Sequence, residues 1–240
     1  MKKAISPAAL CRGGDFFYRI SLPFSLRLAA NGLSECVDQV TVVFNKGALS
    51  LAGENGIAAV SIIMYLRFLV IGVYFGYSKG ISPLLGFFLG RRDIPYCRAL
   101  EKRSRSLLLV LPPLLYALTF LSAPVLAGFF AAKGSQVFHL SVRGLRLYGL
   151  GFLFRGWNIF SAIRLTAYGQ GHRAGLITSL RSFFLLLLFL WLLPRYLGLD
   201  GIWLSVPCAE VLTLPVSVFF LLRDQDRGQA DRFLRDITAA

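Results

Sequence analysis

The chain has 240 residues, of which 56% are hydrophobic and only 16% are charged, and it carries a formal net charge of +14. Soluble domains usually contain about 25% charged residues, so this composition excludes an ordinary soluble protein and indicates an integral membrane protein. Continuously apolar runs such as SFFLLLLFLWLLP also exclude an outer-membrane barrel, whose strands are about ten residues long and alternate in polarity.

Six segments are long and apolar enough to cross a bilayer as helices. A hydrocarbon core of about 30 Å requires about 20 apolar helical residues. The segments are residues 30–51, 58–78, 107–130, 142–168, 174–193 and 202–222. The sequence therefore predicts an all-α integral membrane protein, with a basic lead-in at 1–28, a six-helix lobe at 29–222 and a solvated tail at 223–240. Arg12 interrupts the first apolar run of the lead-in, so we do not expect a cleaved signal peptide.

The basic residues gather in alternate connections between the expected spans. They are Lys2, Lys3, Arg12, Arg19 and Arg27 before the first span, Arg91, Arg92, Arg98, Lys102, Arg103 and Arg105 after the second, Arg164 and Arg173 between the fourth and fifth, and Arg223, Arg227, Arg232 and Arg235 at the end. The positive-inside rule then predicts cytoplasmic termini, with residues 53–55, 131–136 and 195–200 outside. The charge indicates topology and contact with membrane lipid, and we expect no nucleic-acid partner.

Three prolines are expected to shape the helices. The second span continues through GYSKGISPLLGFFLG to Gly90, which predicts one long helix bent at Pro83. The following segment, RRDIPYCRALEKRSR, is predicted to be an amphipathic connector on the cytoplasmic face. Pro207 and Pro215 interrupt the last span, where neighbouring helices or a cavity must satisfy the freed backbone groups.

The first span carries a polar stripe. Asn31, Glu35, Asp38 and Asn45 recur at helical spacing and share one face, which cannot point to lipid. Two carboxylates about one turn apart suit a proton carrier or a cation site. The alternative is that both acids simply pair with arginines or lysines elsewhere in the bundle.

Further charges lie in the other spans. Arg67 and Arg155 are the deep basic residues, and Arg155 shares a helix face with Asn158 in a span that contains no acid. In the last span, Glu210 begins a third polar stripe, for which the favoured interpretation is an interhelical hydrogen bond or ion pair. These residues are candidates for lining a cleft.

The sequence shows no pattern typical of a metal site or an enzyme. The four cysteines form no CxxC pair, and there are only two histidines, so no metal-ligand cluster is predicted. The sequence also contains no HExxH element. We therefore expect no enzymatic activity and no cofactor other than a coupling ion.

Six stretches together resemble a known family. They are NGLSE, LAGENGIAA, GYSKGISPLLGFFLG, LRLYGLGFLFRGWNIF, SLRSFFLLL and LPRYLGLDGIWLSVPCAE, in this order over roughly residues 29–222. The series resembles the C-terminal half of multidrug and toxic compound extrusion (MATE) transporters. The resemblance implies one of two six-helix lobes around a central cleft, which exchanges inward Na⁺ or H⁺ for outward amphipathic, often cationic, compounds. It also implies that Glu35 matches the functional acid of the seventh helix.

The chain departs from this family pattern by adding positive charge to the cleft side. Lys79 replaces a common glutamine, Arg67 occupies the middle of its helix, and Arg155 with Gly156 occupies a span that bears an aspartate in several branches. A second departure is the missing first lobe, since alternating access requires two halves.

The leading hypothesis is a half-transporter for ion-coupled efflux of small organic compounds, completed by a homodimer partner or by a separate N-terminal lobe. A flippase of the same superfamily is one alternative, in which Arg67 and Arg155 hold the pyrophosphate of a lipid-linked saccharide. The other alternative is a truncated or assembly protein of the membrane that transports nothing.

Overall fold

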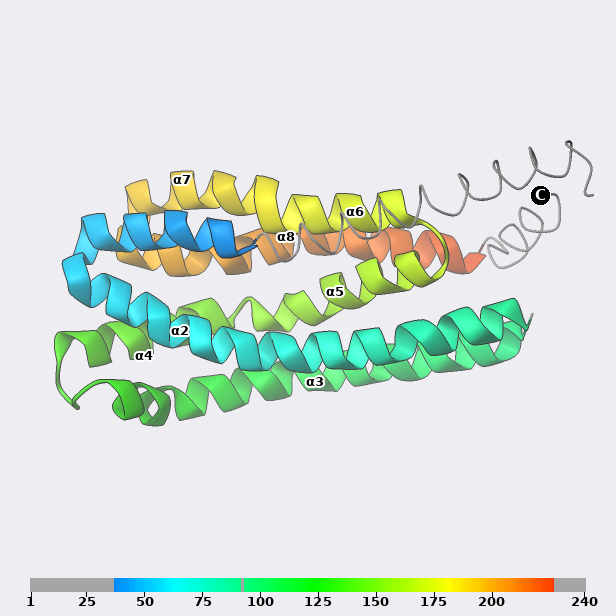
Figure 1. The fold of residues 1–240 in the computed structure, drawn as a ribbon, viewed down its shortest axis with the longest axis horizontal. Helices are drawn as coiled ribbons and strands as arrows, with labels where there is room; N and C mark the ends of the chain where they lie inside the picture. The colour runs from blue at the N-terminus through cyan, green and yellow to red at the C-terminus, as the bar shows by residue number, and fades with distance from the viewer. Residues whose placement is uncertain (1–36, 92, 227–240) are drawn as a thin grey trace, which may run out of the picture.

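The computed structural model describes residues 37–91 and 93–226, and within them the chain forms an elongated all-α bundle (Figure 1). The elements are α2 (Val37–Gly90), α3 (Ile94–Phe130), α4 (Gln136–Gly149), α5 (Phe152–Ala167), α6 (Gly171–Ser179), the π-helix η1 (Leu180–Phe184), α7 (Leu185–Leu197) and α8 (Leu199–Asp226). The predicted all-α membrane fold is confirmed. The expected lead-in at 1–28 lies outside the described residues.

Helix α2 contains two of the expected crossings. Its 54 residues are helical except at Gly53, whose φ of 61° and ψ of −149° break the helix. Glycine adopts this left-handed φ without the steric cost that a Cβ would impose. The first arm of α2, residues 37–52, runs to one end of the bundle. The second arm, residues 54–90, returns along the full length of the bundle (Figure 1).

Four helical segments of the described chain are long and apolar enough to cross a membrane, against the six expected. They are Val42–Gly90, Ile94–Phe130, Gly171–Leu197 and Leu199–Leu222. The difference has two causes: the first segment holds both arms of α2, and the fourth expected crossing is divided between α4 and α5. From the second arm of α2 onward, the chain nevertheless runs back and forth along the long axis of the bundle (Figure 1).

The connections between crossings lie alternately at the two ends of the bundle. The turn of α2, the α3–α4 connection and the α7–α8 connection lie at one end, and the α2–α3 and α5–α6 connections lie at the other (Figure 1). This is the alternation that the distribution of basic residues predicts. Which end faces the cytoplasm stays a prediction.

The segment after α2 is not a surface connector, as the sequence suggested, but the first three turns of α3. Asp93 caps this helix by accepting a hydrogen bond from the backbone N–H of Tyr96, at 3.2 Å. Cys97, Glu101 and Ser104 are buried, and their spacing of four and three residues places them on one helix face. The sequence did not reveal this buried stripe, because most of the neighbouring residues in the segment are charged.

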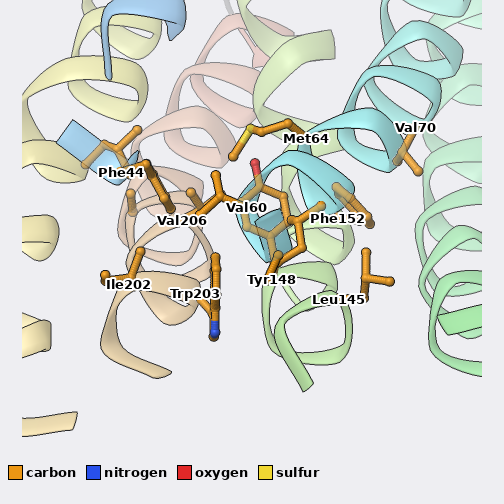
Figure 2. Close-up of a cluster of buried hydrophobic side chains, with 14 of the residues drawn as sticks. Phe44, Val60, Met64, Val70, Leu145, Tyr148, Phe152, Ile202, Trp203 and Val206 are labelled. Atoms are coloured by element: carbon orange, nitrogen blue, oxygen red, sulfur yellow. The ribbon is translucent and has the colours of Figure 1, made fainter. Parts of the chain in front are cut away.

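The largest core cluster packs the second arm of α2 against α4, α5 and α8 (Figure 2). Trp203 of α8 is completely buried in it. Gly144 of α4 permits the close contact, because a Cβ there would lie 2.5 Å from Ile63 Cδ1 and 3.2 Å from the Trp203 ring. Small residues at helix contacts are typical of membrane bundles, where close backbone approach replaces the hydrophobic driving force.

Candidate functional site

The most heavily charged part of the interior surrounds Glu210 of α8, which is 1% exposed. Arg155 Nε of α5 donates to Glu210 Oε1 at 2.6 Å. Asn158 Nδ2, one turn further along α5, donates to Glu210 Oε2 at 2.8 Å and to the Glu210 backbone carbonyl at 3.0 Å. The acid that the fourth span lacks is therefore supplied by the last one.

A second arginine reaches the same carboxylate. Arg181 Nη1 lies 3.5 Å from Glu210 Oε1, and the Arg181 side chain is 10% exposed. This arginine belongs to η1, the π-helical turn between α6 and α7. An extra residue in a helical turn changes the direction of the side chains, and such turns are frequent at functional sites.

A third arginine, Arg67, lies in the second arm of α2 and is 7% exposed. Its Nη1 donates to the sulfur of Met64 at 3.2 Å, although a thioether is only a weak acceptor. Arg67, Arg155 and Glu210 all lie within electrostatic range of Arg181. Among the described residues, Arg67 forms no ion pair.

The arginine cluster is defined as Arg67, Arg155 and Arg181, together with Glu210, and it has more positive than negative charge. Two of its guanidinium groups, those of Arg155 and Arg181, contact the Glu210 carboxylate, and two of their donors, Arg155 Nη1 and Arg181 Nε, are buried without a hydrogen-bond partner among the described residues. Leaving a charged donor unsatisfied in a low-dielectric interior costs several kcal/mol. The cluster is thus not a closed set of ion pairs.

Glu210 lies near the middle of Leu199–Leu222, the part of α8 that is long and apolar enough to cross a membrane. Glu210 is eleven residues after the start of α8 at Leu199, which at about 1.5 Å per residue is about 16 Å into a core about 30 Å thick. Charge at this depth is costly and typically marks a pathway or a binding site.

A glycine and a helix break position Arg155. A Cβ on Gly156 would lie 2.7 Å from Tyr74 Cε1, so only glycine lets α5 approach α2 this closely. The hydroxyl of Tyr74 donates to the Phe152 carbonyl at 2.8 Å. The break between α4 and α5 lies beside Pro207, where a Cβ on Gly151 would be 3.4 Å from the proline backbone. These contacts hold α5 and α8 together around the ion pair.

A separate and balanced ion pair joins α3 to α5. Arg164 Nε and Nη2 donate to the two oxygens of Glu101 at 2.6 Å and 3.2 Å, and both side chains are buried. The Arg164 guanidinium also lies 4.9 Å from the centre of the Tyr168 ring. Arg164 Nη1 is buried without a hydrogen-bond partner in the described part of the chain, but one arginine here faces one acid, which is the ordinary structural arrangement.

The structure brings together Arg155, Asn158 and Glu210 of the predicted cleft residues, with Arg67 close by. Asn31 and Glu35 lie outside the described residues, and of Asp38 the structure describes only its place in the first arm of α2. Asn45 follows in the same arm, and its side-chain oxygen is buried without a hydrogen-bond partner.

Pro83, Pro207 and Pro215 lie inside their helices, as predicted. The only non-helical residue of α2 is Gly53, so the expected bend at Pro83 does not break this helix.

Three buried ionic residues were not predicted. Glu101 and Arg164 were assigned to cytoplasmic connections because of their charged neighbours, and Arg181 was not singled out. A single arginine entering the apolar run RSFFLLLLFL is a signal that could have identified Arg181, since such a residue must face the bundle interior. Within the described part of the chain, no group of three His, Cys, Asp or Glu residues could hold a metal ion.

Comparison with known proteins shows which family this chain matches and which solved structures have a similar fold. The family model described as MatE matches residues 36–193. No curated protein matches the chain.

Three solved structures share the fold at low sequence identity. The outward-facing conformation of a multidrug resistance MATE family transporter of the MOP superfamily is similar over 97% of this chain and 49% of its own, at a TM-score of 0.73 and 18% identity. A point mutant of the Vibrio cholerae MATE transporter VcmN is similar over 85% of this chain and 47% of its own, at a TM-score of 0.75 and 18% identity. A MOP superfamily transporter from Pyrococcus furiosus is similar over 92% of this chain and 48% of its own, at a TM-score of 0.71 and 19% identity. That protein is described as having a binding pocket of reverse polarity, which suggests a different function. The chain spans about half the length of these proteins.

Proposed function

The chain belongs to the MatE family, and from this premise we propose that it is one lobe of a transporter that moves small organic molecules across a membrane. The observation that carries the proposal is the extent of the structural match, which covers 97% of this chain but only 49% of a MATE family transporter. An alternating-access cleft forms between two halves that rock about a shared site. The active form would therefore contain a second lobe, either another copy of this chain or a separate N-terminal half.

We further propose that transport is coupled to H⁺ or Na⁺ through the first arm of α2. Glu210 is a poor candidate for the coupling group because two arginines already neutralise it. An acid without such a partner needs a proton or a metal ion to become neutral inside the membrane. Glu35 and Asp38 are the acids that the sequence places on the polar face of this arm, and the unpartnered oxygen of Asn45 would suit a neutral ligand deeper in the same site.

The coupling proposal is tested by carboxamide substitution, which keeps the shape of an acid but removes its titration. Glu35→Gln should abolish gradient-driven efflux in the assembled transporter without changing expression or membrane insertion, and Asp38→Asn should weaken efflux or shift its dependence on pH or Na⁺. The matched control is Glu54→Gln in the exposed turn of α2, which should leave efflux unchanged. Full efflux by Glu35→Gln would exclude Glu35 from coupling.

The requirement for a second lobe has its own test. The purified chain should run as a dimer, or should bind no drug until a second lobe is co-expressed. Saturable drug transport into vesicles that each contain a single copy of the chain would contradict the two-lobe proposal.

One alternative function is favoured by a specific observation. The excess of arginine over acid in the arginine cluster suits a flippase that carries a lipid-linked pyrophosphate better than it suits export of an organic cation. Competition between a lipid-linked saccharide and a cationic dye in the same vesicles would decide between these two substrates.

A further inference from the structure

We infer that the arginine cluster of Arg67, Arg155 and Arg181 is a binding site for an oxyanion of the phosphate class. As a statement about the transported substrate, this inference rests on the proposed function, whereas anion binding itself can be measured without transport. The argument depends on how the charges inside the bundle are balanced.

Two sets of buried charged side chains, the Arg164–Glu101 pair and the arginine cluster, differ in the ratio of arginines to acids. Arg164 and Glu101 form a one-to-one pair in which both carboxylate oxygens accept a guanidinium hydrogen. In the arginine cluster, Arg155 and Arg181 both contact the single carboxylate of Glu210, and among the described residues Arg67 contacts only a thioether and an aromatic ring. A purely structural role would require no more arginines than the acid can neutralise. Counted over the described residues, the three arginines and Glu210 leave an excess of two positive charges for a ligand to neutralise.

The free hydrogen-bond donors indicate the chemistry of that ligand. Arg155 Nη1 and Arg181 Nε are buried and without a partner among the described residues, as is Arg164 Nη1 of the balanced pair. The arginine cluster differs from that pair because it also contains the guanidinium of Arg67, which lacks any oxygen acceptor among the described residues. Planar guanidinium groups match the oxygens of carboxylates and phosphates in bidentate geometry. Glu210 already shows that the cluster accepts a carboxylate. A doubly charged phosphate would satisfy the remaining donors and offset both excess charges, whereas an organic cation would be repelled.

Arg67 provides the sharpest variant because it has no described acid partner. Among the described residues, Arg67→Gln leaves no carboxylate unpaired, and it removes a buried charge of the same sign as that of Arg181. The variant should therefore fold and, without added anion, should be at least as heat-stable as the parent chain. Arg146→Gln is the matched control, since Arg146 is an exposed arginine on α4 that packs over the Phe120 ring, 4.6 Å from its centre.

The experiment measures the thermal unfolding of the purified full chain in a neutral maltoside detergent, followed by tryptophan fluorescence. Potassium phosphate and pyrophosphate are titrated against potassium chloride at equal ionic strength. We expect a saturable rise in Tm for the parent chain and for Arg146→Gln. In Arg67→Gln the apparent affinity should fall about tenfold or more, as expected when one charge-assisted hydrogen bond is lost.

A parallel arm distinguishes a free phosphate from a lipid headgroup. Micelles are doped with phosphatidic acid or with diacylglycerol, which has the same chains but no phosphate. A response to free phosphate assigns the site to a soluble anion, and a response to phosphatidic acid alone assigns it to a lipid phosphate.

The inference is overturned if neither phosphate source raises Tm above its control, or if Arg67→Gln responds as the parent chain does. Such a result would leave the transport proposal standing. Phosphate binding by a chain that never transports, even with a second lobe, would overturn the transport proposal and leave the site.

Discussion

The ion pair between Arg155 and Glu210 permits a quantitative test of the buried charge balance. Glu210→Gln removes the acid that Arg155 and Arg181 both contact, while the amide oxygen can still accept a hydrogen bond from Arg155. Breaking a buried ion pair by removing one partner costs about 3–5 kcal/mol. The retained hydrogen bond favours the lower end, about 3 kcal/mol, which for a chain of this size corresponds to a fall in Tm of about 6–12 °C.

Substitution of the other partner, Arg155→Gln, should lower the stability by less, because it leaves Glu210 beside a second arginine. Arg155→Gln leaves Glu210 with Arg181, whose Nη1 is 3.5 Å away, and with the amide of Asn158 at 2.8 Å. The carboxylate then still has an opposite charge beside it. We therefore expect Arg155→Gln to be less destabilising than Glu210→Gln.

The double variant Glu210→Gln with Arg155→Gln completes the cycle. It restores the net charge of the parent cluster, so it should be more stable than Glu210→Gln alone, with a coupling energy of about 2 kcal/mol. Thermal unfolding in detergent provides the measurement, and Glu54→Gln serves as an exposed acid control. A Tm for Glu210→Gln within about 2 °C of the parent, well short of the shift expected for a chain of this size, would refute the reasoning. A double variant less stable than the sum of both singles predicts would do the same.

Three further predictions follow from other contacts. Glu101→Gln should lower the stability of the bundle by about 3–5 kcal/mol, because it leaves Arg164 buried and unpaired, and thermal unfolding will show whether Glu101→Gln with Arg164→Gln recovers the loss. Gly156→Val should destabilise the fold by about 1–3 kcal/mol through a clash with the Tyr74 ring, whereas Gly76→Val, at an open position, should not. Asn55→Cys in a cysteine-free background should react with a membrane-impermeant maleimide added outside intact cells, and labelling only after permeabilisation would reverse the predicted topology.

The crossings of this bundle could be predicted from the sequence because each depends on local properties. The length and apolarity of a segment decide whether it can cross a bilayer, and the glycines at 53 and 198 mark turns with positive φ. Two features escaped this reasoning. The charged start of α3 appeared to be a surface connector, although Cys97, Glu101 and Ser104 form a buried stripe. The division of the fourth crossing into α4 and α5 occurs where Gly151 packs against Pro207, a contact between distant parts of the chain.

The sequence by itself determined that Arg67, Arg155 and Glu210 need polar surroundings, because charged side chains cannot face lipid. It did not determine their partners. Glu210 and Arg155 are separated by 55 residues, and neither spacing nor composition shows which helices lie side by side or how each is rotated. Only the tertiary structure decided that Glu210 faces Arg155 of α5 and Arg181 of η1. The close contacts of Gly156 with Tyr74 and of Gly151 with Pro207 constrain how α5 packs against α2 and α8. This packing between distant parts of the chain brings charges that are scattered in the sequence into one cluster.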